Sequence, residues 1–173
     1  MSTRAARAAS EIVNLEARAA LKAGLSVLFC MGETAAERGE GGDAEQRRRA
    51  EAILEEQVRV GLEGLAGFLG SSQPARLVVG YEPRWAIGPG KVPPDPPYIG
   101  FVAGIIKAAA ERIHGISMPV IYGGGLKKEN AASIASVSAI DGGLVALTRF
   151  TGEIGFRVDD LAEIIGEYRR GRG

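Results

Sequence analysis

The chain has 173 residues, which is enough for one domain with a sizeable core and too few for two of ordinary size. Its 21 basic and 21 acidic residues balance, so no net field favours nucleic acid or an anionic membrane surface as a partner. No apolar stretch approaches the roughly 20 residues of a membrane span, and the single cysteine, Cys30, cannot form an internal disulfide, which favours the reducing cytoplasm.

The first half of the chain alternates between helical and strand patterns. Ile12 and Leu15 stand at helical spacing in residues 8–23, and a continuous apolar run predicts a strand over residues 26–31 that is buried on both faces. A stripe of apolar residues from Leu54 to Leu69 predicts one long amphipathic helix. A second buried strand is predicted over residues 76–80.

The second half continues this alternation. The expected elements are, in order, a helix over residues 101–113, a strand over 119–122, a short helix over 130–136, a strand over 143–147 and a helix over 158–168. The Arg-rich tail is expected to fray. Strands that alternate with helices pair in parallel through right-handed crossovers. The pattern therefore predicts an α/β fold, and it leaves open whether the parallel sheet closes into a (β/α) barrel or stays an open, doubly wound sheet.

The most informative segment, residues 80–91, follows the second predicted strand. Glu82 stands at the C-terminal end of that strand, where parallel barrels build their active sites, and Pro83 stiffens the exit. Gly88 and Gly90 bracket a short loop whose apolar body could fold over a substrate and exclude water. These features predict a catalytic carboxylate followed by a lid, although a Glu that only pairs with a Lys or Arg fits the position as well.

Residues 82–91, Glu-Pro-Arg-Trp-Ala-Ile-Gly-Pro-Gly-Lys, resemble the signature of the triosephosphate isomerase family, in which the catalytic Glu is followed directly by the closing loop. Three further segments are similar to motifs of that family in the same order: Leu-Phe-Cys-Met-Gly-Glu-Thr at 28–34, Val-Ile-Tyr-Gly-Gly-Gly at 120–125 and Ile-Asp-Gly-Gly-Leu-Val at 140–145. The resemblance implies a parallel (β/α)8 TIM barrel. Residues 1–173 would form a single domain with about four of the eight strands, the C-terminal half.

The resemblance assigns roles to individual residues. Glu82 would be the base that moves a proton between adjacent carbons of an α-hydroxy carbonyl through an enediolate, interconverting glyceraldehyde 3-phosphate and dihydroxyacetone phosphate without cofactor or metal. Cys30 and Glu33 would mainly support the barrel and the lid. The implied phosphate-binding positions are Gly88, Gly125, Ala146 and Leu147, and the implied lid and latch positions are Pro83, Trp85, Ala86, Ile87, Gly90, Lys91 and Tyr122.

The chain also departs from the family pattern. Ala146 and Leu147 stand where the family has a Gly-Gly pair whose amides bind phosphate, and Gly125 stands where it usually has a phosphate-contacting Ser. Arg149 could add positive charge there, although a solvated surface Arg is the more ordinary interpretation. Arg84 and Pro89 differ from the commonest lid residues, which keeps open an isomerase that acts on a tetrulose phosphate.

The first half of the family's barrel has no counterpart in this sequence. The family's catalytic Lys and the His that polarises the carbonyl are therefore missing, and His114, at the end of a predicted helix, is not expected to replace them. Loss of a single oxyanion donor costs about 10²–10³ in rate, so a catalytically silent half-barrel is a second interpretation. The open sheet edges favour a homo-oligomer or pairing with a complementing barrel half.

Overall fold

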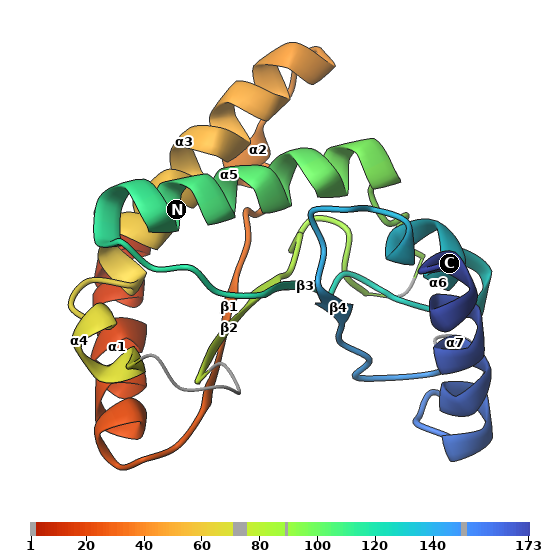
Figure 1. The fold of residues 1–173 in the computed structure, drawn as a ribbon. Coiled ribbons are helices and arrows are strands. Elements are labelled where there is room, and N and C mark those ends of the chain that lie inside the picture. Colours follow the sequence, from red (N-terminus) through yellow and green to blue (C-terminus); the bar gives the residue numbers. More distant parts are fainter. Residues whose placement is uncertain (1–2, 71–75, 89, 150–151) are drawn as a thin grey trace.

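The computed structural model describes residues 3–70, 76–88, 90–149 and 152–173. Its four parallel strands, which lie in the sheet in chain order, are β1 (Val27–Met31), β2 (Leu77–Tyr81), β3 (Val120–Tyr122) and β4 (Gly142–Gly143). A doubly wound sheet reverses its strand order and carries helices on both faces, whereas here the order does not reverse and the helices arch over one side (Figure 1). The prediction of a partial TIM-type barrel is confirmed, and the open alternative is wrong.

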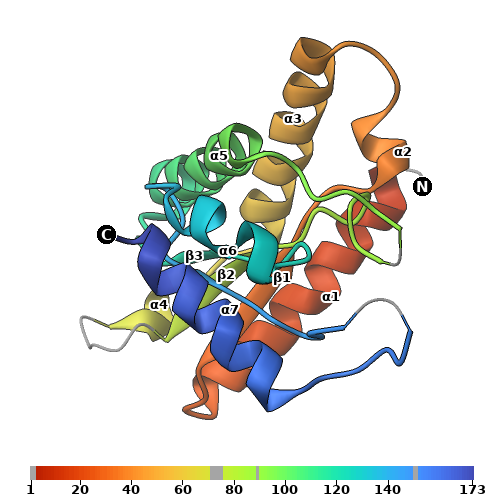
Figure 2. The same ribbon diagram turned by 90° about the vertical axis from the view of Figure 1, so that its right-hand side faces the viewer.

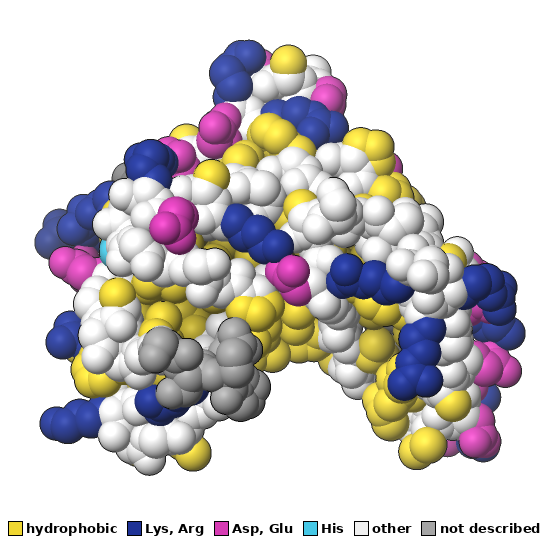
Figure 3. Space-filling view, in the orientation of Figure 1, with side chains coloured by type: hydrophobic (Ala, Val, Ile, Leu, Met, Phe, Trp, Pro, Cys, Tyr) yellow, Lys and Arg dark blue, Asp and Glu magenta, His cyan; other side chains and the backbone are white. Residues whose placement is uncertain are grey.

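The helices of the described residues form the two ends and the top of an arch. They are α1 (Thr3–Lys22), α2 (Ala35–Arg38), α3 (Asp43–Gly61), α4 (Ala66–Leu69), α5 (Pro96–His114), α6 (Lys128–Ala135) and α7 (Val158–Gly171). Helices α1, α3 and α4 lie at one end, α5 crosses the top, and α6 packs beside α7 at the other end (Figures 1 and 2). Hydrophobic side chains line the recess between the two ends (Figure 3). No described helix has the length and apolar character needed to cross a membrane.

Strand register explains where the core lies. Phe29 pairs with Val79, and Val79 with Val120, so one row of side chains runs across three strands. All members of this row are buried beneath the helices. Successive strand residues point to opposite faces, so the alternate positions face the recess. There Leu28 is 45% exposed and Cys30 is exposed, which corrects the prediction that the first strand is buried on both faces.

The expected long helix from Leu54 to Leu69 is wrong, because it is two helices, α3 and α4. The side-chain amide of Asn14 on α1 donates to the carbonyl oxygens of Gly61 and Glu63, at 2.9 Å each. These bonds satisfy carbonyls at the C-terminal end of α3 and hold the turn that follows it. The leucine spacing predicted the buried side correctly, but it could not show that a residue from another helix ends α3.

Two predictions near the C-terminus also need correction. The strand expected over residues 143–147 pairs only as far as Gly143, because β3 ends at Tyr122 and provides no further partner. The tail expected to fray continues α7 to Gly171. The guanidinium of Arg172 donates to the Ile140 carbonyl oxygen at 2.6 Å, and this bond ties the end of the chain to the sheet.

The first helix is confirmed, but its apolar stripe faces outwards. Ile12 is 58% exposed and Leu15 is 64% exposed, whereas the buried side contains Ala17 and Leu21. None of the described residues covers the outward stripe of α1. This face and the open side of β1 are therefore two apolar surfaces that the described fold leaves to solvent.

Candidate functional site

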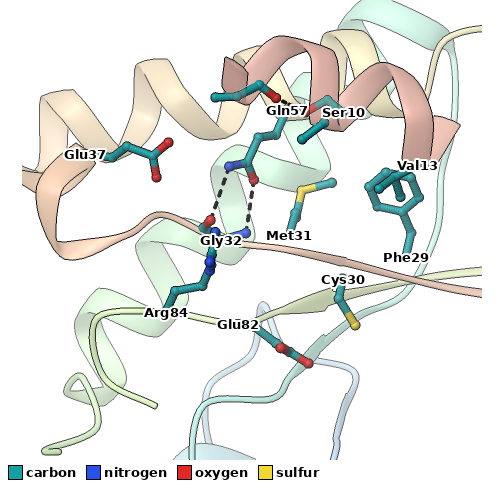
Figure 4. A pocket seen from close by; sticks show the side chains of 12 residues that line it. Ser10, Val13, Phe29, Cys30, Met31, Gly32, Glu37, Gln57, Glu82 and Arg84 are labelled. Atoms are coloured by element: carbon teal, nitrogen blue, oxygen red, sulfur yellow. Dashed lines mark hydrogen bonds between the residues drawn. The ribbon is translucent and has the colours of Figure 1, made fainter. Parts of the chain in front are cut away.

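Glu82 lies directly after β2, at the edge where the C-terminal ends of three strands meet. Its backbone N–H donates to the Met31 carbonyl oxygen of β1 at 2.8 Å. Its side chain reaches across to the end of β3, where a Cβ built on Gly123 would lie 2.9 Å from the Glu82 Cγ. Figure 4 shows the Glu82 carboxylate on the same side of the strands as the Cys30 thiol. The carboxylate is thus half-buried among backbone and one thiol.

Gly32 sets the position of Glu82. A Cβ at Gly32 would lie 1.8 Å from the backbone oxygen of Glu82, a separation that only a glycine avoids without moving a strand. The side-chain amide of Gln57 on α3 holds the same residue, because it accepts from the Gly32 N–H at 3.0 Å and donates to the Gly32 oxygen at 3.2 Å (Figure 4). The ends of β1 and β2 are therefore held together at the carboxylate.

The surroundings of the Cys30 thiol raise its pKa. Desolvation, and then the negative charge of Glu82, raise its pKa to about 11. Both causes disfavour the thiolate, so the group is protonated at neutral pH and stays neutral beside the carboxylate.

We expect alkylation of Cys30 by iodoacetamide in the folded chain to increase with pH through a midpoint of about 11, because the thiolate is the reacting species. In the unfolded chain the midpoint should lie near the ordinary value of about 8.5. A raised folded pKa contributes stability that is complete below the unfolded pKa and is lost as pH rises towards the folded one. Mass spectrometry of alkylation rates, with and without urea, checks this; equal midpoints in both states would contradict it.

Buried Glu33 organises the segment that follows Glu82. Its side chain is 0% exposed, and its Oε1 accepts from the Trp85 indole at 2.7 Å, the Tyr98 hydroxyl at 2.9 Å and the Tyr81 hydroxyl at 3.1 Å. The guanidinium of Arg38 lies 3.8 Å from the centroid of the Trp85 ring. Trp85 is thus fixed to β1, α2 and α5 at the start of the expected lid.

Sequence reasoning gave Glu33 a supporting position but missed Tyr98, Arg38 and Gln57. The helix expected over residues 101–113 begins earlier, at Pro96, because Asp95 caps α5 by accepting from the Tyr98 N–H at 2.8 Å. In the sequence Tyr98 looks like any core aromatic near a helix start. Only the fold brings it to Glu33, because the two residues stand 65 positions apart.

Two cavities lie near these residues, and Glu82 lines the first of them. The second, of about 400 Å³, brings most of the predicted residues together. Its walls include all the expected phosphate-binding positions and four of the lid positions, namely Gly88, Gly125, Ala146, Leu147, Ala86, Ile87, Gly90 and Lys91. Gly125 has a φ of 84°, a left-handed conformation that a glycine adopts without strain, which accounts for glycine in place of the usual Ser. Gly123 lines the same cavity, so the Glu82 side chain lies against one of its walls.

The other predicted residues lie outside this cavity. Glu82 and Arg84 line a separate cavity of about 320 Å³ beside β1. Pro83 is buried, Trp85 is held by Glu33, and the buried Tyr122 hydroxyl donates to the Gly124 oxygen at 2.5 Å. Pro89 lies outside the described residues.

Arg149 and His114 do not line the second cavity. Arg149 pairs with Asp160 on α7 at 2.8 Å instead of lining it. His114 lies in the last turn of α5, as predicted, with its Nε2 3.0 Å from the Val58 oxygen of α3, and lines neither cavity. Within the described part of the chain, no group of three or more His, Cys, Asp or Glu residues is arranged to hold a metal ion.

Comparisons with known proteins identify the family of the chain. A family model described as Triosephosphate isomerase matches residues 3–165. The triosephosphate isomerase of Nitratidesulfovibrio vulgaris is 35% identical over 90% of this chain and 56% of its own length, and that of Citrifermentans bemidjiense is 40% identical over 78% and 51%. The L-erythrulose-1-phosphate isomerase of Rhizobium rhizogenes is 34% identical over 91% and 54%.

A solved structure shares the fold. The crystal structure of triosephosphate isomerase from Bartonella henselae aligns with a TM-score of 0.68 at 24% identity, covering 92% of this chain and 57% of that one. The chain therefore spans about half the length of the proteins it matches.

Proposed function

The chain belongs to the triosephosphate isomerase family, and from this premise we propose that it supplies the base, the lid and the phosphate-binding part of an aldose–ketose isomerase. The reaction is the interconversion of glyceraldehyde 3-phosphate and dihydroxyacetone phosphate. The observation that carries the proposal is the position of Glu82, at the end of β2 and against the Gly123 wall of the cavity lined by lid residues. Residues 1–173 act in this proposal as one domain, the C-terminal half of the barrel.

Proton transfer is the task of Glu82. One carboxylate oxygen takes the proton from the carbon next to the carbonyl, and the electrons of the broken C–H bond form the C=C bond of an enediolate. A proton then passes from the hydroxyl oxygen to the former carbonyl oxygen, and the carboxylate returns its proton to the neighbouring carbon, which converts aldose to ketose with no net change in atoms or charge. The negative charge that develops on oxygen needs hydrogen-bond donors. The family resemblance assigns these to a Lys and a His in the half of the barrel that this sequence does not cover.

The lid is the task of residues 83–91. Trp85, bound to Glu33, anchors its first part, and the apolar side chains of Ala86 and Ile87 already line the 400 Å³ cavity. Closure over a bound phosphate brings the Gly88 amide towards it, opposite the backbone of Gly125 and of Ala146-Leu147. Tyr122, whose hydroxyl now bonds to the Gly124 oxygen, is the proposed latch for the closed lid.

An isomerase assay tests the proposal. Purified chain is given glyceraldehyde 3-phosphate with a coupled readout of dihydroxyacetone phosphate, and L-erythrulose 1-phosphate is tested in parallel. The relatives named L-erythrulose-1-phosphate isomerase, together with Arg84 in the Glu82 cavity, favour the tetrulose alternative. A higher kcat/KM for triose phosphate removes that alternative. A folded chain that converts neither substrate, even when the missing barrel half of a relative is added, leaves the catalytically silent half-barrel.

We propose a complementing barrel half as the partner. Four consecutive residues, from Phe29 to Gly32, line the 320 Å³ cavity together with Ala6 and Ser10 of α1. Consecutive residues point to opposite faces of a strand, so this cavity follows the edge of β1 and not one face of it. In the described residues β1 pairs only with β2. An added strand fits this edge, beneath the outward apolar stripe of α1.

Sedimentation velocity of the chain, alone and mixed with the N-terminal half of a relative's barrel, distinguishes the possible partners. A complex of one chain with one half supports the proposal, and a dimer of the chain alone supports the homo-oligomer instead. A well-folded monomer that ignores the added half would count against both.

The lone thiol of Cys30, with no second cysteine in the sequence, leads us to propose the cytoplasm as the location.

A further inference from the structure

The charge of the 400 Å³ cavity differs from that of the surrounding surface. Lys91 and Lys127 are among its lining residues, and no acidic residue is. The rest of the lining is apolar side chains and glycine backbone. Lys91 is exposed and Lys127 is half-buried, and two cations beside one cavity attract an anion more strongly than either does alone.

Neither lysine is neutralised by a neighbour. In the described ranges Lys91 and Lys127 have no ion pair and no side-chain hydrogen bond. The adjacent Lys128 differs, because it pairs with Glu163 of α7 at 2.9 Å. Lys127 is half-buried at the start of α6, whereas Lys128 is exposed. Of these two neighbouring lysines, Lys128 is therefore paired with a carboxylate and Lys127 faces the cavity.

The backbone N–H of Lys127, at the start of α6, already has an acceptor. The Lys127 N–H donates to Asn130 Oδ1 at 2.8 Å, and the Asn130 amide donates to the Gly125 oxygen at 3.1 Å. An anion at the start of α6 therefore cannot take the Lys127 amide without displacing Asn130, whereas the Lys127 ammonium group remains available as a donor. Arg149, the other cation near the Ala146-Leu147 turn, is held by Asp160.

We propose that Lys91 and Lys127 together bind the phosphate group of the substrate, in place of part of the backbone cup. Lys91 stands at the end of the lid segment and Lys127 at the N-cap of α6, so a phosphate dianion between them bridges the lid and the fixed wall of the cavity. Binding of the anion then favours the closed lid, because closure brings the second cation to it. The inference rests on the proposed function for the identity of the phosphorylated ligand, but not for the cavity.

Isothermal titration with inorganic phosphate and with dihydroxyacetone phosphate tests the pair. Lys127→Met keeps the aliphatic stem and removes the charge, and should weaken both ligands by about ten-fold or more. Lys91→Met should weaken them as well, and Lys127→Arg should retain binding. The matched control is Lys128→Met, which removes the neighbouring, acid-paired charge and should leave binding unchanged. Higher ionic strength should weaken wild-type binding more than that of Lys127→Met.

Two results overturn the inference: phosphate binding by Lys127→Met that equals that by Lys128→Met, or no binding of phosphate by the folded wild-type chain. The outcome is separable from that of the proposed isomerase. Phosphate binding that depends on Lys127, in a chain that converts no sugar phosphate, upholds the anion site and removes the enzyme. Turnover that depends on Glu82, together with phosphate binding that does not depend on Lys127, upholds the isomerase and removes the two-lysine anion site.

Discussion

The substitution Glu82→Gln is expected to lower kcat by about 10²–10⁴-fold in any assembly of this chain that isomerises triose phosphate. The amide has nearly the size of the carboxylate but does not accept the proton. KM should change little, because Glu82 does not line the cavity in which the phosphate group is proposed to bind. Steady-state kinetics with glyceraldehyde 3-phosphate measure both constants.

A matched control separates loss of the base from loss of the fold. Glu51 is exposed on α3, so Glu51→Gln should retain wild-type activity. Removal of the Glu82 charge should also lower the pKa of Cys30, since that charge is one cause of its raised value, and alkylation rates report this independently of turnover. Activity of Glu82→Gln within ten-fold of wild type would remove Glu82 as the base.

The substitution Glu33→Ala is expected to destabilise the fold by about 3–5 kcal/mol. Three buried donors, from Tyr81, Trp85 and Tyr98, lose their common acceptor. The loss is smaller than three full penalties, because the second carboxylate oxygen of Glu33 is buried without a partner in the described structure. Urea unfolding followed by the fluorescence of Trp85, the one tryptophan of the chain, measures the change.

Glu33→Gln provides the comparison, since it keeps an oxygen at the position that accepts the three bonds and replaces the second, unpartnered oxygen by an NH2 group. It should cost less than half as much as Glu33→Ala. In the native state of Glu33→Ala the Trp85 emission should shift to longer wavelength, because the indole loses its anchor and gains water. A loss below about 1 kcal/mol with unchanged emission would mean that the cluster does not hold the lid, since surface substitutions give changes of that size.

The strands and their active edge could be predicted because they depend on local pattern. Apolar runs located β1, β2 and β3 to within about one residue, and the position of Glu82 at a strand end follows from the same pattern. The family signature supplied the rest of the site, and the cavity unites positions as distant in sequence as Gly88 and Leu147. Side-chain periodicity cannot show such a meeting, because it depends on the order of strands in the sheet.

What could not be predicted depends on contacts between distant side chains. Asn14 ends α3 from another helix, and Tyr98 joins Glu33 from α5. The length of β4 depends on where β3 ends. The stripe with Ile12 and Leu15 was correctly helical, yet its direction depends on which neighbours the helix has, and the described residues leave it outside.

The Gln57 amide that holds Gly32 also limits how the sheet can be extended. It occupies both backbone hydrogen-bonding groups of Gly32, the residue that follows β1. The backbone groups of Met31 already face β2, since its oxygen accepts from the Glu82 N–H. A parallel strand added at this edge can therefore pair with the backbone of β1 only up to Cys30. Gln57 thus limits how far an added strand can pair along β1, and it ends that pairing next to the segment that carries Glu82.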